Sequence, residues 1–191
     1  GTTVADNTLI QMNGALTGML TTQGFRDQLE LRRGYKEDIW DVRLPPPTPL
    51  IPRRRRLGVP ERVRFDGSVH TPLDEAAARR AIQRLGRQGV ESVAICTLFS
   101  FVNPAHERRL AQLVAEELPG VELSLSHEVL PKAPEFERAS TTAVNAYIGP
   151  CVTRYLERLA ERLRTAGYAS QLLVVQASGG VMTLEYLRGS P

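Results

Sequence analysis

Alternating apolar and polar stretches divide the middle of the chain into strands and helices. Residues 92–101 are almost continuously apolar, which is typical of a strand covered on both faces in a parallel sheet. Residues 121–126 alternate apolar with polar side chains and predict a second strand nearer a sheet edge. A segment with apolar residues at helical spacing precedes each strand, and these two segments begin at Pro72 and at Asn103-Pro104. Residues 72–126 therefore predict an α-β-α-β run within an α/β layer.

The N-terminal part predicts two short helices on either side of one strand. Residues 4–12 have helical spacing, residues 16–22 are small and branched as in a strand, and residues 25–31 predict the second helix. The next stretch, 32–52, contains five prolines, which rule out a regular helix or a central strand. We expect it to be a long loop or arm.

Two helix boundaries are marked by specific residues. Thr71 is the expected N-cap of the helix that follows it, Pro72 suits the first helical position, and Asp74 lies where a capping box places its acid. Further on, residues 136–164 form a long helical region. Gly149-Pro150 is expected to kink this region or break it into two helices.

The composition is that of an ordinary globular protein, with 42% hydrophobic residues, 24% charged residues and a formal net charge of +3. It excludes a disordered or fibrous chain. No apolar run approaches the roughly 18 residues of a membrane span, so we expect no membrane partner. Cys96 and Cys151 lack metal-ligand spacing and predict two reduced thiols in a cytoplasmic protein, with no metal site.

The basic run Arg53 to Arg56 allows two interpretations. It is able to grip phosphates, which makes a non-enzymatic basic binding module one hypothesis. No aromatic residues are interleaved for base stacking, however, so we favour an edge strand protected by charge and expect no nucleic-acid partner. In that interpretation residues 53–57 pair with residues 62–65. His106 falls in the first turn of a helix and is expected at the surface, and the three histidines show no metal or triad spacing.

Three short segments have the chemistry of binding sites. A helix start with hydroxyls favours anions, a polar cluster in the long helical region suits the lining of a cleft, and a Gly-rich turn after the buried strand 172–176 suits a phosphate or oxyanion. Plain N-capping or an ordinary turn is the simpler explanation of each. The candidate nucleotide- or substrate-binding residues are Thr2, Thr3, Asn7, Ser140, Thr141, Thr142, Asn145, Ser178, Gly179 and Gly180. No catalytic residue is identified.

Seven segments, taken in order, resemble the motifs of one known family. They are GTTVADNTL (1–9), LTTQGFRD (20–27), VPERV (59–63), FSFVNPAHE (99–107), SHEVLP (126–131), ERASTTAVNAY (137–147) and QASGGVM (176–182). Together they are similar to the motifs of the hydantoinase A/5-oxoprolinase family, which includes subunits of acetone and acetophenone carboxylases. The resemblance covers essentially the whole chain.

The resemblance implies an actin-like ATPase fold with ribonuclease H-like α/β layers and a mixed sheet. It also implies ATP and Mg²⁺ as cofactors and a small cyclic amide as the substrate. Such an enzyme opens a hydantoin, N-methylhydantoin or 5-oxoproline ring after phosphorylation of the carbonyl oxygen. The alternative is the nucleotide-handling subunit of a ketone carboxylase. A hydantoinase B-type partner and a homo- or hetero-oligomer are expected in either case.

Other family motifs are missing between residues 1 and 191. The phosphate loops D-x-G-G-T-F-T-D and S-G-P-A-G-G do not occur, and the chain opens without Met. We therefore expect an internal fragment that spans parts of two subdomains, is inactive alone and binds ATP weakly. Asp6 and Ala177-Ser178 depart from the family pattern, which leaves the substrate open. The expected organisation is the end of an N-terminal subdomain (1–31), a proline-rich arm with edge strands (32–71), an α/β subdomain (72–135) and the start of a hydantoinase A-type domain (136–191).

Overall fold

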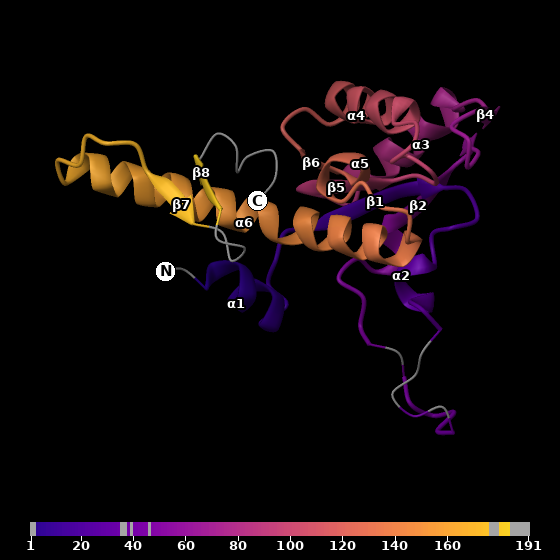
Figure 1. The fold of residues 1–191 in the computed structure, drawn as a ribbon, viewed down its shortest axis with the longest axis horizontal. Coiled ribbons are helices and arrows are strands. Elements are labelled where there is room, and N and C mark those ends of the chain that lie inside the picture. The colour runs from indigo at the N-terminus through magenta and orange to yellow at the C-terminus, as the bar shows by residue number, and fades with distance from the viewer. Residues whose placement is uncertain (1–2, 35–37, 39, 46, 176–179, 184–191) are drawn as a thin grey trace.

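The computed structural model describes residues 3–34, 38, 40–45, 47–175 and 180–183. Its centre is a four-stranded sheet in the order β2-β1-β5-β6, in which every neighbouring pair runs parallel. Helices α3 and α4 cover one face, and the N-terminal half of α6 covers the other (Figure 1). The α/β class is confirmed. The expected mixed sheet does not occur among the described residues, because the antiparallel pairs β3-β4 and β7-β8 form two separate two-stranded sheets.

The predicted helices and strands occur in the predicted order, but the strand expected over 92–101 ends at Cys96, and residues 69–71, 126–129 and 181–183 form further short elements. The helices are α1 (Val4–Ile10), α2 (Gln28–Leu31), the 3-10 turn η1 (Arg53–Arg55), α3 (Glu75–Gly86), α4 (Ala105–Glu117), α5 (Ser126–Val129) and α6 (Glu135–Thr165). The strands are β1 (Thr17–Thr22), β2 (Arg56–Val59), β3 (Arg62–Val63), β4 (Val69–Thr71), β5 (Ser92–Cys96), β6 (Glu122–Leu125), β7 (Leu173–Val175) and β8 (Val181–Thr183). The described residues between α2 and η1 form no helix or strand, as the prolines predict.

The two faces of β5 belong to two different cores. Val93 and Ile95 pack with the apolar faces of α3 and α4, whereas Ala94 and Cys96 face α6. All five residues of β5 are buried, as expected for a strand covered on both sides. The α6 side is lined by small residues, including Ala139 of the helix. Small side chains on both surfaces let the helix lie close to the sheet.

Helix α6 is one continuous helix through Pro150, so the predicted break into two helices is wrong. Proline has no N–H to donate to the carbonyl four residues earlier, which here belongs to Ala146. The sheet supplies replacement donors: Ser92 Oγ donates to Ala146 O at 2.6 Å, and Thr17 Oγ1 lies 3.5 Å away. The adjacent Tyr147 carbonyl accepts from the backbone N–H of Ala15 at 2.9 Å. These contacts hold the proline position against the amino ends of β1 and β5.

This arrangement predicts that Ser92 and Pro150 are energetically coupled. Ser92→Ala should lower the free energy of unfolding by about 1–2 kcal/mol, because the buried Ala146 carbonyl keeps only its long contact to Thr17. In a Pro150→Ala background the new N–H reaches Ala146 O, and the cost of Ser92→Ala should fall by about half or more. Urea unfolding of the four proteins of this cycle checks the prediction, and strictly additive effects would contradict it.

Two sequence predictions about local structure are corrected. Residues 53–57 and 62–65 do not pair with each other: β2 joins the edge of the main sheet beside β1, and β3 pairs with β4. The N-cap of α3 is Asp74, whose Oδ1 accepts from the Ala77 N–H at 2.8 Å, so neither Thr71 nor Pro72 begins the helix. Thr71 instead ends β4, because its pairing with Arg62 holds it in an extended strand.

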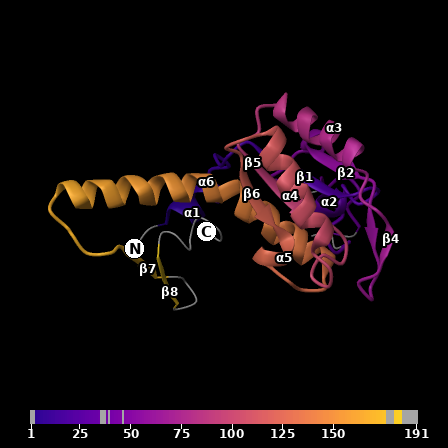
Figure 2. The same ribbon diagram turned by 90° about the horizontal axis from the view of Figure 1, so that it is seen from above.

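The C-terminal half of α6 extends beyond the sheet (Figures 1 and 2). Strands β7 and β8 lie beside it, and Leu156 and Met182 form the centre of a small separate core. Leu173 and Val175 of β7 are exposed, so the prediction that strand 172–176 is buried is wrong. Helix α1 packs against α6 as well. One helix therefore connects the four-stranded sheet to the start of a second packing unit.

Candidate functional site

Strands β1, β2 and β5 all end at the same edge of the sheet because they run parallel. Ligand sites of open α/β sheets lie beyond this carboxyl edge. A connected set of polar residues follows the strand ends here, and most of these residues are buried. The carboxyl-edge network, as we name it, consists of Thr22, Glu61, Thr97, His106, Glu107, Ser126, His127 and Arg138.

Glu107 is the most highly connected residue of this network. Its Oε1 accepts from the Thr97 N–H at 2.8 Å and from Ser126 Oγ at 2.6 Å. Its Oε2 accepts from the His127 N–H at 3.1 Å and lies 2.7 Å from His127 Nδ1. The residue is completely buried in the first turn of α4. It thus ties together the segments that follow β5 and β6.

Glu61 and His106 form a second carboxylate–imidazole pair. Glu61 Oε2 lies 2.7 Å from His106 Nδ1, and its Oε1 accepts from the Thr22 hydroxyl. Thr22 Oγ1 in turn accepts from the Leu98 N–H at 3.0 Å. His106 is only 8% exposed, so the prediction of a surface histidine is wrong. Helical spacing alone could not show that the first turn of α4 is covered by the segment after β2.

Arg138 connects α6 to the same edge. Its guanidinium donates to the carbonyls of Lys132 and Thr97 at 2.9 and 3.1 Å and to Glu135 at 2.7 Å. It also lies over the Phe101 ring, 5.1 Å from the centroid. The side chain is fully buried. Burial raises the pKa of Glu135, and the neighbouring Arg138 partly opposes that rise.

The geometry makes the carboxyl-edge network a positioning device. All four carboxylate oxygens of Glu61 and Glu107 have partners, and a carboxylate on Nδ1 fixes the orientation of an imidazole ring. Among the described residues, no three His, Cys, Asp or Glu side chains gather closely enough to hold a metal ion. The network holds the loops after β2, β5 and β6 in one arrangement.

The predicted helix-start and Gly-turn sites are only partly described. Thr2, Ser178 and Gly179 lie outside the described residues. Thr3 is the N-cap residue of α1, but its side chain makes no cap hydrogen bond to the backbone; its hydroxyl instead accepts from Asn7 Nδ2 at 3.2 Å. Thr3, Asn7 and Gly180 are exposed.

The polar cluster of the long helix lies in the helix interior rather than at its start. Because α6 begins at Glu135, the expected capping role of Ser140 and Thr141 is wrong. Ser140 Oγ donates to the Glu137 carbonyl at 3.2 Å, and Thr141 is exposed. Ser140 lines a cavity, described below.

Thr142 and Asn145 are buried side chains of α6. Thr142 Oγ1 donates to the Arg138 carbonyl of its own helix at 2.6 Å, and Asn145 Nδ2 donates to Ser124 Oγ of β6 at 2.9 Å. The Asn145 amide therefore fastens α6 to the sheet, whereas the Thr142 hydroxyl is satisfied within the helix.

Much of the charge of the Arg53–Arg56 run is engaged within the chain. Arg53 forms an ion pair with Asp27 at 2.9 Å, and this hydrogen bond lowers the pKa of the Asp27 carboxyl. Arg56 is fully buried, where it binds Glu30 and donates to the Arg26 carbonyl at 3.1 Å. Because Arg53 and Arg56 already have partners within the chain, these contacts do not favour phosphate binding by Arg53–Arg56.

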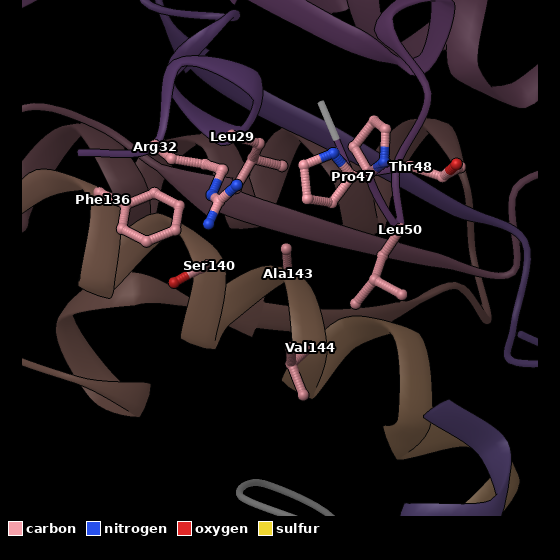
Figure 3. A pocket seen from close by; sticks show the side chains of 10 residues that line it. Leu29, Arg32, Pro47, Thr48, Leu50, Phe136, Ser140, Ala143 and Val144 are labelled. Atoms are coloured by element: carbon pink, nitrogen blue, oxygen red, sulfur yellow. The ribbon is translucent and has the colours of Figure 1, made fainter. Parts of the chain in front are cut away.

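A cavity of about 170 Å³ lies between α2, residues 47–50 and the N-terminal half of α6 (Figure 3). Leu29, Leu50 and Ala143 give it an apolar lining. Three polar side chains, Arg32, Thr48 and Ser140, also line it. Ser140 was predicted as a site residue from its hydroxyl. The cavity itself was not predictable from sequence, because three segments distant in sequence form its walls.

The two cysteines should differ sharply in reactivity. Burial raises the pKa of the Cys96 thiol to about 12, whereas Cys151 is partly exposed on α6. Because the thiolate is the reactive form, iodoacetamide at about pH 8 should modify Cys151 and leave Cys96 intact in the folded protein. Peptide mapping checks this result, and equal labelling of both thiols without denaturant would contradict it.

The fold and its likeness to solved structures define an α/β protein with the actin-like ATPase fold. The crystal structure of ATP-dependent caprolactamase from Pseudomonas jessenii matches with a TM-score of 0.89 and 42% identity over 95% of this chain. A nucleotide-free acetone carboxylase structure matches over 98% of the chain with a TM-score of 0.79 at 24% identity, which supports the fold alone. The model for the hydantoinase/oxoprolinase N-terminal region matches residues 1–118, and the hydantoinase/oxoprolinase model matches residues 138–191. The chain belongs to the hydantoinase/oxoprolinase family.

The curated relatives are much longer than this chain. The caprolactamase subunit alpha of Pseudomonas jessenii is 42% identical over 183 residues, which is 95% of this chain and 26% of the relative. The acetophenone carboxylase gamma subunit of Aromatoleum aromaticum is 35% identical over 94% of this chain and 26% of its own length. The 5-oxoprolinase of Saccharomyces cerevisiae is 26% identical over 95% of this chain and 16% of its own length. The chain thus spans about a quarter or less of these relatives, some of which are named as subunits.

No helix among the described residues is both long and apolar enough to cross a bilayer. Helix α6 has the length, but charged residues recur along it, as at Arg154, Glu157 and Arg158.

Proposed function

We propose that the full-length protein carrying this chain opens a cyclic amide at the expense of ATP. The observation that carries the proposal is the match to ATP-dependent caprolactamase, at 42% identity and a TM-score of 0.89 over 95% of this chain. The likeness to a 5-oxoprolinase supports the same reaction class. Which ring the protein opens, whether a lactam, a hydantoin or 5-oxoproline, stays part of the proposal.

The proposed chemistry begins at the amide carbonyl, because an amide is a poor electrophile. The carbonyl oxygen attacks the γ-phosphorus of ATP and ADP leaves. Water attacks the carbon, and the C–N bond breaks as the nitrogen takes up a proton, which gives a ring-opened amine with an acyl phosphate. A second water then attacks the acyl carbon, and phosphate departs with the original carbonyl oxygen to leave the carboxylate. Such a path needs positioning and charge stabilisation more than a protein nucleophile.

The described residues do not by themselves fit ATP or Mg²⁺. The cavity of about 170 Å³ beside α2 is too small for a nucleotide, and the larger pockets beside the C-terminal half of α6 offer one cationic side chain, Arg164, for its phosphates. No cluster of metal-ligating side chains occurs in the described part of the molecule. We therefore assign phosphate binding to other parts of the full-length protein. The residues of this chain hold the carboxyl-edge loops and α6 in place around the phosphate-binding parts.

Substrate-stimulated ATP hydrolysis by the full-length protein tests the proposal. Phosphate release is measured with lactams, hydantoins and 5-oxoproline, each with and without Mg²⁺. At least one ring should raise turnover well above the ATP-only rate, and no stimulation across the panel would sink the proposal. The 191-residue chain alone should give only a weak calorimetric signal with ATP.

The second candidate function is ATP-dependent carboxylation of a ketone. The 35% identity to the acetophenone carboxylase gamma subunit favours it. The same assay with a ketone in place of the ring discriminates between the two, because carboxylation requires bicarbonate and ring opening does not. Ketone consumption that depends on bicarbonate would select the second candidate.

Assembly and location complete the proposal. We propose that the protein works with a hydantoinase B-type partner in a hetero-oligomer, which is supported by the subunit names of its relatives. We also propose that it works in the cytoplasm, in keeping with two free thiols in the chain.

A further inference from the structure

We propose that the cavity between α2, residues 47–50 and α6 binds the ring of a small cyclic secondary amide. Apolar cavities of about 150 Å³ hold benzene-sized molecules, so a volume of about 170 Å³ suits a ring of about six or seven non-hydrogen atoms. A nucleotide or a peptide does not fit. The choice of ligand class rests on the proposed function, but the binding itself can be tested without ATP turnover.

The apolar walls match the methylene groups of such a ring. Leu29 comes from α2, Leu50 from the segment before η1, and Ala143 and Phe136 from α6. Figure 3 shows Ala143 on the α6 wall between Arg32 and Leu50. Leu29 and Leu50 also pack against the buried core on this side of the sheet, which fixes the walls to the main fold.

Two of the three polar side chains that line the cavity, Arg32 and Ser140, match the two ends of an amide. Figure 3 shows the Thr48 hydroxyl directed away from both. Figure 3 shows the Arg32 side chain reaching from α2 toward Phe136 and Ser140 on α6. A guanidinium has five N–H donors and can donate to a carbonyl oxygen. The Ser140 hydroxyl donates to the Glu137 carbonyl at 3.2 Å, so its oxygen can still accept the N–H of the ring. A ketone of the same size would use the first contact but not the second.

Backbone strain supports a binding role for Arg32. Its φ and ψ are 53° and −134°, a region that non-glycine residues rarely adopt. Such strain costs about 1–3 kcal/mol and tends to occur at ligand sites. This backbone conformation holds the Arg32 side chain at the end of α2, where the side chain lines the cavity.

Binding of two rings of equal size to the full-length protein tests the inference. The probes are 2-piperidone, a cyclic amide, and cyclohexanone, a ketone, and the readout is saturation-transfer NMR with titration. The amide should bind more tightly than the ketone. Ser140→Ala should weaken binding of the amide roughly two- to tenfold and leave binding of the ketone unchanged, because only the amide N–H can donate to the hydroxyl.

Filling the cavity gives the second arm of the test. Ala143→Leu and Ser140→Met should each weaken both rings by at least about tenfold. Arg158→Leu, at an exposed position of the same helix, is the matched control and should bind both rings as the wild type does. Two filling variants are used so that one misfolded protein, detected by circular dichroism, does not decide the result.

The outcomes separate this inference from the proposed function. Failure of both rings to bind the wild-type protein, or binding unchanged in both filling variants, would overturn the cavity as a ring site. If a ring stimulates ATP turnover and Ala143→Leu does not change that turnover, the cavity is not the ring site, but the proposed function stands. Ring binding that Ala143→Leu abolishes, in a wild-type protein without ring-stimulated turnover, would keep the site and remove the function.

Discussion

Replacing Glu107 with Ala should lower the free energy of unfolding by about 3–5 kcal/mol. The substitution removes a buried carboxylate that accepts from two backbone N–H groups, at Thr97 and His127, and from the Ser126 hydroxyl. It also leaves His127 Nδ1 without its partner 2.7 Å away. A methyl group offers none of these donors an acceptor, and water has little access to a fully buried site. Urea unfolding measures the loss.

Glu116→Ala is the matched control for this prediction. Glu116 lies on the same helix, but it is exposed and pairs with the surface residues Arg79 and Arg109. Exposed ion pairs contribute little, so its loss should cost at most about 1 kcal/mol. Similar costs for the two glutamates would show that the carboxyl-edge network does not hold the fold together.

Replacing Arg138 with Met should cost about 2–4 kcal/mol at neutral pH. Methionine fills much of the same space, but the carbonyls of Thr97 and Lys132 lose their buried donors and Glu135 loses its cation. Thermal and urea unfolding measure the change. Arg164→Met is the control, because its ion pair with Glu161 is exposed on the same helix. Equal effects of the two substitutions would contradict the prediction.

The cost of Arg138→Met should also depend on pH. Burial already raises the pKa of Glu135 in the folded protein, and loss of Arg138 removes an opposing influence. An acid with a raised folded-state pKa takes up its proton in the folded state first, so stability falls as pH rises from about 4.3 through the raised value. The difference from the wild type should therefore narrow when the pH is lowered from 7 to about 5. A difference that widens on acidification would contradict this explanation.

The parts of the fold with regular periodicity were predictable from sequence. The apolar run of β5, the alternation of β6 and the spacing of α4 each reflect contacts that recur along one element. The errors arose where distant partners decide the local structure. Pro150 stays within a helix because Ser92, 54 residues before Ala146, donates to the Ala146 carbonyl that proline leaves unpaired. Residues 56–59 join the main sheet because β1 lies beside them.

The same reason limited the prediction of the site. His106 appeared to be a surface residue because Glu61, its partner, lies 45 residues earlier in the sequence. A usable signal was present, since Glu61, Glu107 and His127 all follow strands that run parallel, and their side chains therefore gather at one edge. Ser140 was named from its hydroxyl, but no sequence pattern placed Leu29 or Pro47 opposite it.

The central claim is that the protein activates a cyclic amide by transferring phosphate to its carbonyl oxygen. The most direct measurement follows that oxygen. The full-length protein is given ATP and a ring that it turns over, labelled with ¹⁸O at the carbonyl, and the released phosphate is analysed by mass spectrometry. The account predicts that the label appears in inorganic phosphate in proportion to ring opening. Ring opening with unlabelled phosphate, and all of the ¹⁸O retained in the carboxylate product, would contradict it.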